Sequence, residues 1–89
     1  MSAPGVSAPT PRTALLIGAA GGILKEVSRR LAEEGHTLVL FDRDAAAVHR
    51  LAEELGLITK VEAVVGDITD IPAAERQLTD IVDRFAPSI

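Results

Sequence analysis

Three short apolar runs alternate with three segments of helical character along most of the chain. The runs cover residues 13–17, 37–41 and 61–65 and contain mostly leucine, isoleucine and valine. A segment with helical spacing of apolar residues follows each run. Strands that alternate with helices of this length are joined by right-handed crossovers and form a parallel sheet. The pattern therefore predicts an α/β fold with a buried parallel sheet.

Capping signals predict where the helices begin and end. Glycine commonly follows a helix C-terminus, so Gly35 and Gly56 are expected to end the first two helices. Asp44 and Asp70 are suited to cap the second and third. The inward faces expected from helical spacing are Ile23, Val27 and Leu31 in the first helix, Val48, Leu51, Ala52 and Leu55 in the second, and Ala74, Leu78, Ile81, Val82 and Phe85 in the third.

The beginning of the chain differs from the rest. Its first eleven residues, MSAPGVSAPTP, hold three of the five prolines and show no apolar periodicity. Proline-rich sequence of this kind is typical of a flexible leader. We therefore expect a leader over residues 1–12 and one small, partial domain over residues 13–89, because 89 residues suffice for a single core.

Composition excludes several classes of function. A net charge of −4 leaves no basic surplus for binding nucleic acid, and the chain has no cysteine and two histidines, which argues against disulfides and metal sites. The apolar run at residues 14–24 is shorter than the roughly 20 residues that span a bilayer. Charged residues at 25–30 follow it, where a signal peptide would have a cleavage site. We expect a cytoplasmic chain that binds no metal, membrane or nucleic acid.

A glycine-rich turn, Gly18-Ala19-Ala20-Gly21-Gly22, separates the first strand from the first helix. Such a turn presents backbone N–H groups and a helix N-terminus, which together favour an anion such as a pyrophosphate. The spacing does not match G-x-G-x-x-G, because Ala20 and Ile23 stand where the second and third glycines would be. The glycines alone are compatible with a phosphate site and with a turn that binds no ligand.

Acidic residues follow the second and third strands. Asp42 ends the second, about 20 residues past the turn, where a carboxylate can accept hydrogen bonds from an adenosine ribose. The carboxylate of Asp42 favours NAD. The adjacent Arg43 could meet a 2′-phosphate, so NADP is not excluded. Asp67 lies in the loop Gly66-Asp67-Ile68-Thr69-Asp70, which opens at the same sheet edge and could face the base. Turn or capping roles are the structural alternatives for both aspartates.

The segments TALLIGAAGGILKEVSRRLAEEGHTLVLFDRD, VVGDITD and DRFAPSI together resemble the N-terminal part of short-chain dehydrogenases/reductases, over about residues 13–89. The resemblance implies a three-layer, Rossmann-like βαβαβα half that stops before a fourth strand. It implies that Asp42 holds the adenosine ribose and that Asp67 and Ile68 contact the adenine. The full set of cofactor-binding residues expected on this basis is Gly18, Ala20, Gly21, Gly22, Ile23, Asp42, Arg43, Asp67 and Ile68.

Leu24 departs from the pattern of that family. The family's turn is Thr-Gly-x-x-x-Gly-x-Gly, or Gly-x-x-Gly-x-x-Gly in its extended branch, and both place a glycine at position 24. The threonine of the first pattern is Ile17 here. A leucine adds bulk where the helix and the pyrophosphate should approach closely. We therefore expect weak or absent binding of NAD or NADP.

The catalytic residues of the family have no counterpart in this chain. Its Asn-Asn-Ala-Gly segment would begin just past Ile89, and its catalytic serine and Tyr-x-x-x-Lys pair lie later still. The chain contains no tyrosine, so it cannot supply that general acid/base. We expect the NAD(P)-binding portion of an oxidoreductase, inactive by itself. A non-catalytic module that binds a nucleotide or a partner, and a vestigial or designed domain with no ligand, are the alternatives.

The strand order of the family also implies an open sheet edge. In the order 3-2-1-4 the fourth strand covers the first, so residues 13–17 would otherwise form an unpaired apolar edge. Such edges pair readily with other chains. We expect self-association through this edge.

Overall fold

The computed structural model describes residues 11–89 and contains three strands that alternate with three helices. In chain order the elements are β1 (Thr13–Ile17), α1 (Gly22–Glu33), β2 (Thr37–Asp42), α2 (Ala45–Leu55), β3 (Val61–Val65) and α3 (Ile71–Phe85). The α/β fold expected from the sequence is confirmed, and the predicted ends of the strands hold or shift by a single residue. Residues 1–10 of the predicted leader lie outside the described residues.

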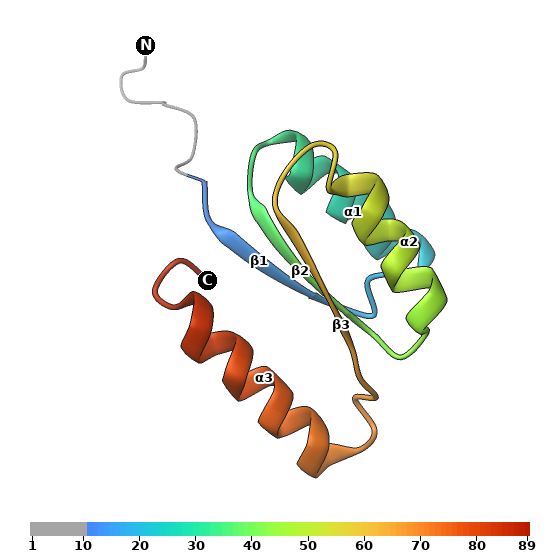
Figure 1. Cartoon of the computed structure of the whole chain (residues 1–89), viewed down its shortest axis with the longest axis vertical. Coiled ribbons are helices and arrows are strands. Elements are labelled where there is room, and N and C mark those ends of the chain that lie inside the picture. The colour runs from blue at the N-terminus through green and yellow to red at the C-terminus, as the bar shows by residue number, and fades with distance from the viewer. Residues whose placement is uncertain (1–10) are drawn as a thin grey trace.

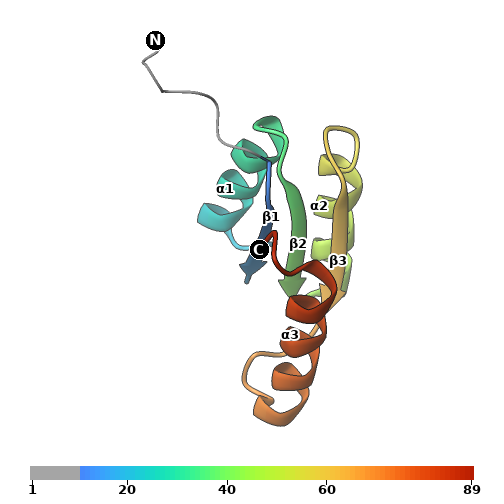
Figure 2. The ribbon, with the colours of Figure 1, turned by 90° about the vertical axis from the view of Figure 1, so that its left-hand side faces the viewer.

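The three strands are parallel and ordered β1-β2-β3, so β2 is central. Helices α1 and α2 lie on one face of this sheet and α3 lies on the other, which makes three layers (Figures 1 and 2). The arrangement is Rossmann-like, as the resemblance implied. Because the strands are parallel, their carboxyl ends and the loops that follow them meet at one edge of the sheet.

Two apolar clusters hold the helices to the sheet. The cluster under α1 and α2 contains Leu16, Ala19, Ala32, Leu38, Leu40, Val48, Leu51 and Leu55. The cluster under α3 is smaller and contains Val39, Phe41 and Ile81, with Leu15, Val64, Leu78 and Phe85 packed around them. Val82, predicted on this inward face, is 45% exposed. Strand β2 contributes alternate residues to both clusters and is buried because helices cover both of its faces.

The buried face of α1 is only partly the predicted one, because Leu31 packs against the α1–α2 cluster but Ile23 and Val27 are exposed. Ile23 and Val27 are 82% and 40% exposed, whereas Ser28 and Ala32 are buried. Leu24 packs against the same cluster as Ala32. The reason is that small residues let the helix lie close to the sheet, and the hydroxyl of Ser28 is satisfied by donating to the Leu24 carbonyl at 2.7 Å. The predicted spacing therefore identified Leu31 correctly but missed Leu24, Ser28 and Ala32.

The predicted caps are present. The Asp44 carboxylate accepts a hydrogen bond from the N–H of Ala47 at 3.0 Å, and Asp70 accepts one from Ala73 at 3.4 Å. Gly35 follows α1 with a φ of 89°, a backbone conformation that favours glycine. These caps fix where each helix begins or ends relative to the carboxyl edge of the sheet.

Candidate functional site

The turn after β1 is held by the neighbouring strand. Gly18 has a φ of 78°, which glycine adopts without strain. Its N–H donates to the Phe41 carbonyl at 2.7 Å, and the N–H of Gly21 donates back to the Gly18 carbonyl at 3.0 Å. The chain thereby leaves the sheet sharply and begins α1 at Gly22.

The N-terminus of α1 has no side-chain cap. Its N-cap residue Gly21 supplies no side-chain hydrogen bond, and the first turn contains no acidic residue. By contrast, Asp44 and Asp70 cap α2 and α3. The first N–H groups of a helix have no intrahelical acceptor and carry a partial positive charge. Of the three helices in the described structure, α1 is therefore the one whose N-terminus is free to receive an anion.

Asp42 joins the end of β2 to the glycine turn. Its Oδ2 accepts a hydrogen bond from the N–H of Ala20 at 3.0 Å, and its Oδ1 accepts one from the N–H of Asp44 at 3.0 Å. An ionised carboxylate has about four acceptor positions, so each oxygen can still accept from a ligand hydroxyl. Asp42 thus orients the turn and can bind a ligand with the same group.

Asp67 follows β3, and hydrogen bonds from Thr69 stabilise the ionised form of its carboxyl group. Its Oδ1 accepts hydrogen bonds from the Thr69 hydroxyl at 2.6 Å and from the Thr69 N–H at 2.9 Å. These two bonds, the hydroxyl's first, lower the pKa of the Asp67 carboxyl, and the positive charge of Arg43 adds to the effect. Asp67 is therefore a fixed negative acceptor beside the third strand.

A cavity of about 370 Å³ opens among the loops that follow the three strands. It is lined by Ile17, Gly18, Phe41, Asp42, Arg43, Gly66, Asp67, Ile68 and Thr69. Ligand pockets are typically of this size or larger, with apolar walls and a few polar groups. Here Ile17, Phe41 and Ile68 are the apolar wall, and Asp42 and Asp67 supply acceptors, which suits a flat base joined to a ribose.

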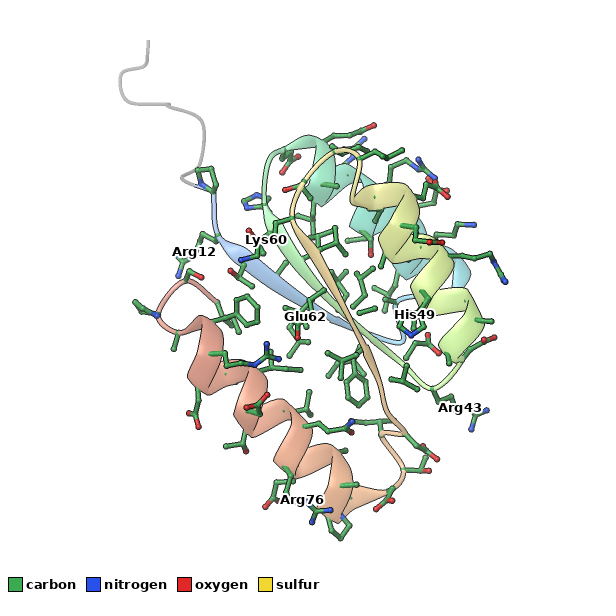
Figure 3. The ribbon with its side chains drawn as sticks, viewed as in Figure 1. Arg12, Arg43, His49, Lys60, Glu62 and Arg76 are labelled. Atoms are coloured by element: carbon green, nitrogen blue, oxygen red, sulfur yellow. The ribbon has the colours of Figure 1, made fainter. Side chains whose placement is uncertain are left out.

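The structure brings most of the predicted site residues to this cavity. Five of them line it: Gly18, Asp42, Arg43, Asp67 and Ile68. Ala20 is joined to it through the hydrogen bond with Asp42, while Gly21, Gly22 and Ile23 lie at the start of α1 and do not line it. Arg43 extends away from the ribbon at the carboxyl end of the sheet (Figure 3).

Sequence reasoning missed four lining residues: Ile17, Phe41, Gly66 and Thr69. Ile17 and Phe41 lie at or next to the ends of β1 and β2, and Gly66 and Thr69 lie in the loop after β3. Their place at the carboxyl edge of the sheet is the signal that could have identified them. Gly66 is also needed for packing, because a Cβ there would lie 2.5 Å from both Phe41 Cζ and Gln77 Oε1. The close approach of Phe41 to this backbone shapes the floor of the cavity.

Leu24 lies under the turn and does not line the cavity. It is half-buried and packs against the α1–α2 cluster. Its Cδ1 is 3.9 Å from a Cβ built on Gly18. The leucine therefore supports the glycine turn from the core side while it occupies the position where α1 begins.

Neither a metal site nor a membrane-spanning helix is found among residues 11–89. No three histidine or acidic side chains there come together as metal ligands would. No helix in that range has the length and apolar character needed to cross a membrane.

We predict that Thr69→Val raises the pKa of Asp67, because the hydroxyl bond is the largest cause of its lowering. A lowered folded-state pKa gives stability that is present above the unfolded value and lost as the pH falls through the folded value. In the variant this loss should occur at higher pH. An NMR titration of the Asp67 carboxyl carbon measures the shift, with Thr79→Val as control. An unchanged titration of Asp67 would contradict the assignment.

Comparison with known proteins adds an independent line of evidence. The sequence pattern of the family described as short chain dehydrogenase matches residues 12–88. The 1-deoxy-11-beta-hydroxypentalenate dehydrogenase of Streptomyces arenae is 40% identical over 75 residues, which cover 83% of this chain and 27% of that one. The 1,6-dihydroxycyclohexa-2,4-diene-1-carboxylate dehydrogenase of Pseudomonas putida is 34% identical over 74 residues, with the same coverage of 83% and 27%.

A solved structure agrees in fold. The orthorhombic crystal structure of the bulky-bulky ketone specific alcohol dehydrogenase from Comamonas testosteroni superposes with a TM-score of 0.73 and 29% identity. The match covers 88% of this chain and 31% of that chain. The chain thus spans between a quarter and a third of the length of the relatives it matches.

Proposed function

The chain belongs to the short chain dehydrogenase family, and on that premise we propose that it is the NAD(P)-binding N-terminal portion of a cytoplasmic oxidoreductase, without catalytic residues of its own. The observation that carries the proposal is that Asp42 and Asp67 line one cavity together with Gly18, the first residue of the turn that leads to the uncapped start of α1. Each lies at or after the carboxyl end of a different strand, and each offers the group that one part of an adenine dinucleotide needs.

The assignment of ligand groups follows from chemistry. The uncapped N–H groups at Gly22 suit the pyrophosphate, because they carry partial positive charge. Asp42 suits the ribose, since its carboxylate can accept from two adjacent hydroxyls. Asp67 and Ile68 suit the adenine, whose amino group is a donor and whose ring is flat and apolar. When bound, the nicotinamide supplies hydride transfer, while this chain binds and orients the adenosine end.

The same contacts favour NAD over NADP. A 2′-phosphate would be placed close to the Asp42 carboxylate, and like charges at short distance repel strongly. Asp42 is held by the N–H groups of Ala20 and Asp44, so turning it away would break two hydrogen bonds. Arg43 is exposed and could offset part of that repulsion. NADP is therefore the second choice.

We predict weak NAD binding by the chain, tighter binding by Leu24→Gly and loss of binding by Asp42→Ala. A glycine at position 24 lets α1 pack closer to the strands, which gives the pyrophosphate more room at the helix start. Isothermal titration calorimetry measures the three affinities. Leu31→Ala is the matched control, because Leu31 packs against the same cluster as Leu24 but lies away from the turn.

The outcomes separate the alternatives. If neither the chain nor Leu24→Gly binds NAD or NADP, the proposal fails and a domain without a nucleotide ligand is favoured. If Leu24→Gly and the unaltered chain bind equally, the leucine is harmless and the expected weakness is wrong. A gain in Leu31→Ala as large as that in Leu24→Gly would show that loosened packing, not room for the pyrophosphate, causes the effect.

We also propose self-association through the outer edge of β1. The N–H of Gly18 faces β2, whereas the N–H of Thr13 faces outward and donates to the Ser88 carbonyl at 3.1 Å. Because this direction alternates along a parallel strand, the backbone groups of Leu15 and Ile17 also point outward. The opposite edge, β3, is protected by Glu62, whose two oxygens accept from Arg84 at 3.0 and 2.6 Å. No residue from 13 to 17 is charged, so beyond Thr13, which is bonded to Ser88, the outward groups of Leu15 and Ile17 lack such protection.

We predict that Ile17→Lys shifts the chain toward monomer, because a lysine on an open edge opposes strand pairing. Val65→Lys is the control, since Val65 is 41% exposed, close to the 39% of Ile17, but lies on the β3 edge. Sedimentation velocity over a range of concentrations measures the effect. A stable monomer in the unaltered chain, or equal effects of the two lysines, would contradict the role of β1.

A further inference from the structure

We propose that a second cavity, between α1 and α2, binds a phosphate group through Lys25 and Arg50. This cavity has a volume of about 210 Å³ and is lined by Ala20, Lys25, Ala47, Arg50, Leu51 and Glu54. It shares no lining residue with the cavity at the ends of the three strands. The phosphate site is therefore separate from the site of the proposed function and does not depend on it.

Helices α1 and α2 bring the two cations to one place. The helices lie side by side on the same face of the sheet (Figures 1 and 2), and both follow parallel strands, so they run in the same direction. Lys25 lies in the first turn of α1, and Arg50 lies in the second turn of α2. Both side chains are exposed, whereas Leu51 is buried and closes the cavity on the core side. The cations are thus open to an ion from solvent.

Neither Lys25 nor Arg50 has an acidic partner in the part of the chain that the structure describes, because every ion pair found there involves another cation. Glu54 lies one turn after Arg50 on α2, a spacing at which such residues often pair. Instead, Glu54 Oε1 accepts a hydrogen bond from the guanidinium of Arg29, one turn after Lys25 on α1. Arg29 therefore balances the negative charge in the cavity, and two positive charges remain unbalanced.

These two charges suit a phosphate group. Like charges that share a small site repel each other, and an anion between them removes the repulsion. A phosphate monoester carries a charge of about −1.5 to −2 at neutral pH. The Arg50 guanidinium can donate two parallel hydrogen bonds to its oxygens, and Lys25 supplies a compact charge. The cavity is smaller than the roughly 300 Å³ at which pockets for drug-sized ligands begin. It therefore fits a phosphate group better than a whole nucleotide.

Ala20 connects this cavity with the strand ends. It lines the cavity, and its N–H donates to the Asp42 carboxylate at 3.0 Å. Two sources can therefore supply the phosphate group: inorganic phosphate from solution, or the 2′-phosphate of an NADP molecule whose ribose lies at Asp42. Both present the same oxygens to Lys25 and Arg50.

Amide NMR spectra recorded with increasing inorganic phosphate, at constant ionic strength, test the proposal. We expect saturable shifts at the residues that line the cavity, above all Ala20, Lys25 and Arg50. Lys25→Gln and Arg50→Gln should each weaken binding about tenfold or more, because each removes a hydrogen bond between charged groups. Arg50→Lys keeps the charge but loses the planar donor pair, so it should weaken binding less than Arg50→Gln.

Lys60→Gln and Arg76→Gln are the matched controls. Lys60 precedes β3 and Arg76 lies on α3 (Figure 3), and both are exposed cations outside the cavity. Neither control should change phosphate binding. A loss in the controls as large as that in Lys25→Gln and Arg50→Gln would show that phosphate responds only to net charge, which overturns the proposal.

Titrations of the phosphate-loaded chain with NAD and with NADP distinguish the two sources. If NADP displaces phosphate and NAD does not, the 2′-phosphate occupies the cavity as well. If neither displaces it, inorganic phosphate is the ligand. Displacement by NAD and NADP alike, shifts centred on Gly21 and Gly22, or no saturable shift at all would overturn the proposal. A phosphate site that fails in these ways leaves NAD binding at Asp42 and Asp67 unaffected, so the proposed function is tested separately.

Discussion

The end of β2 is the part of the structure on which the site depends. The Phe41 carbonyl accepts the N–H of Gly18, and the Asp42 carboxylate accepts the N–H of Ala20. Both bonds hold the glycine turn against a strand that is itself fixed by apolar clusters on its two faces. The turn then directs α1 so that its first N–H groups stay uncapped. Because β2 is central and buried, its end cannot move without disturbing both clusters. The cavity residues at the end of β2 are therefore held in place.

The three helices differ in how they are capped, and the two edges of the sheet differ in how they are protected. Asp44 and Asp70 cap α2 and α3, whereas α1 begins without a side-chain cap, so the positive end of a helix is available at one place among the three. The two sheet edges also differ, because the Glu62–Arg84 ion pair lies on β3 while β1 has no charged residue and is bonded at its outer edge to Ser88 through Thr13. In the proposed function a ligand therefore binds at the β2–β3 side, and the outer edge of β1 pairs with another chain.

The sequence predicted the fold well, because alternation of strands and helices, glycine turns and aspartate caps are local signals. It also identified Asp42 and Asp67, since carboxyl ends of parallel strands must meet. It failed in part at α1, where Leu31 packs on the core as expected but Ile23 is exposed and Ser28 and Ala32 are buried. It could not find the dual role of Asp42, because the bond to Ala20 depends on the three-dimensional path of the turn. Nor could it place Leu24, whose side chain packs on the core side of that turn.

The central claim is that the ends of the three strands form one adenosine-binding site in a chain that carries no catalysis of its own. The most direct test is an amide NMR spectrum of the chain recorded with increasing ADP-ribose. We predict that the largest shifts fall on Gly18, Ala20, Asp42, Asp67 and Ile68, and that exposed residues of α3 away from the site, such as Asp83, stay unchanged. Shifts centred on α3, or shifts confined to β1 without the aspartates, would contradict it.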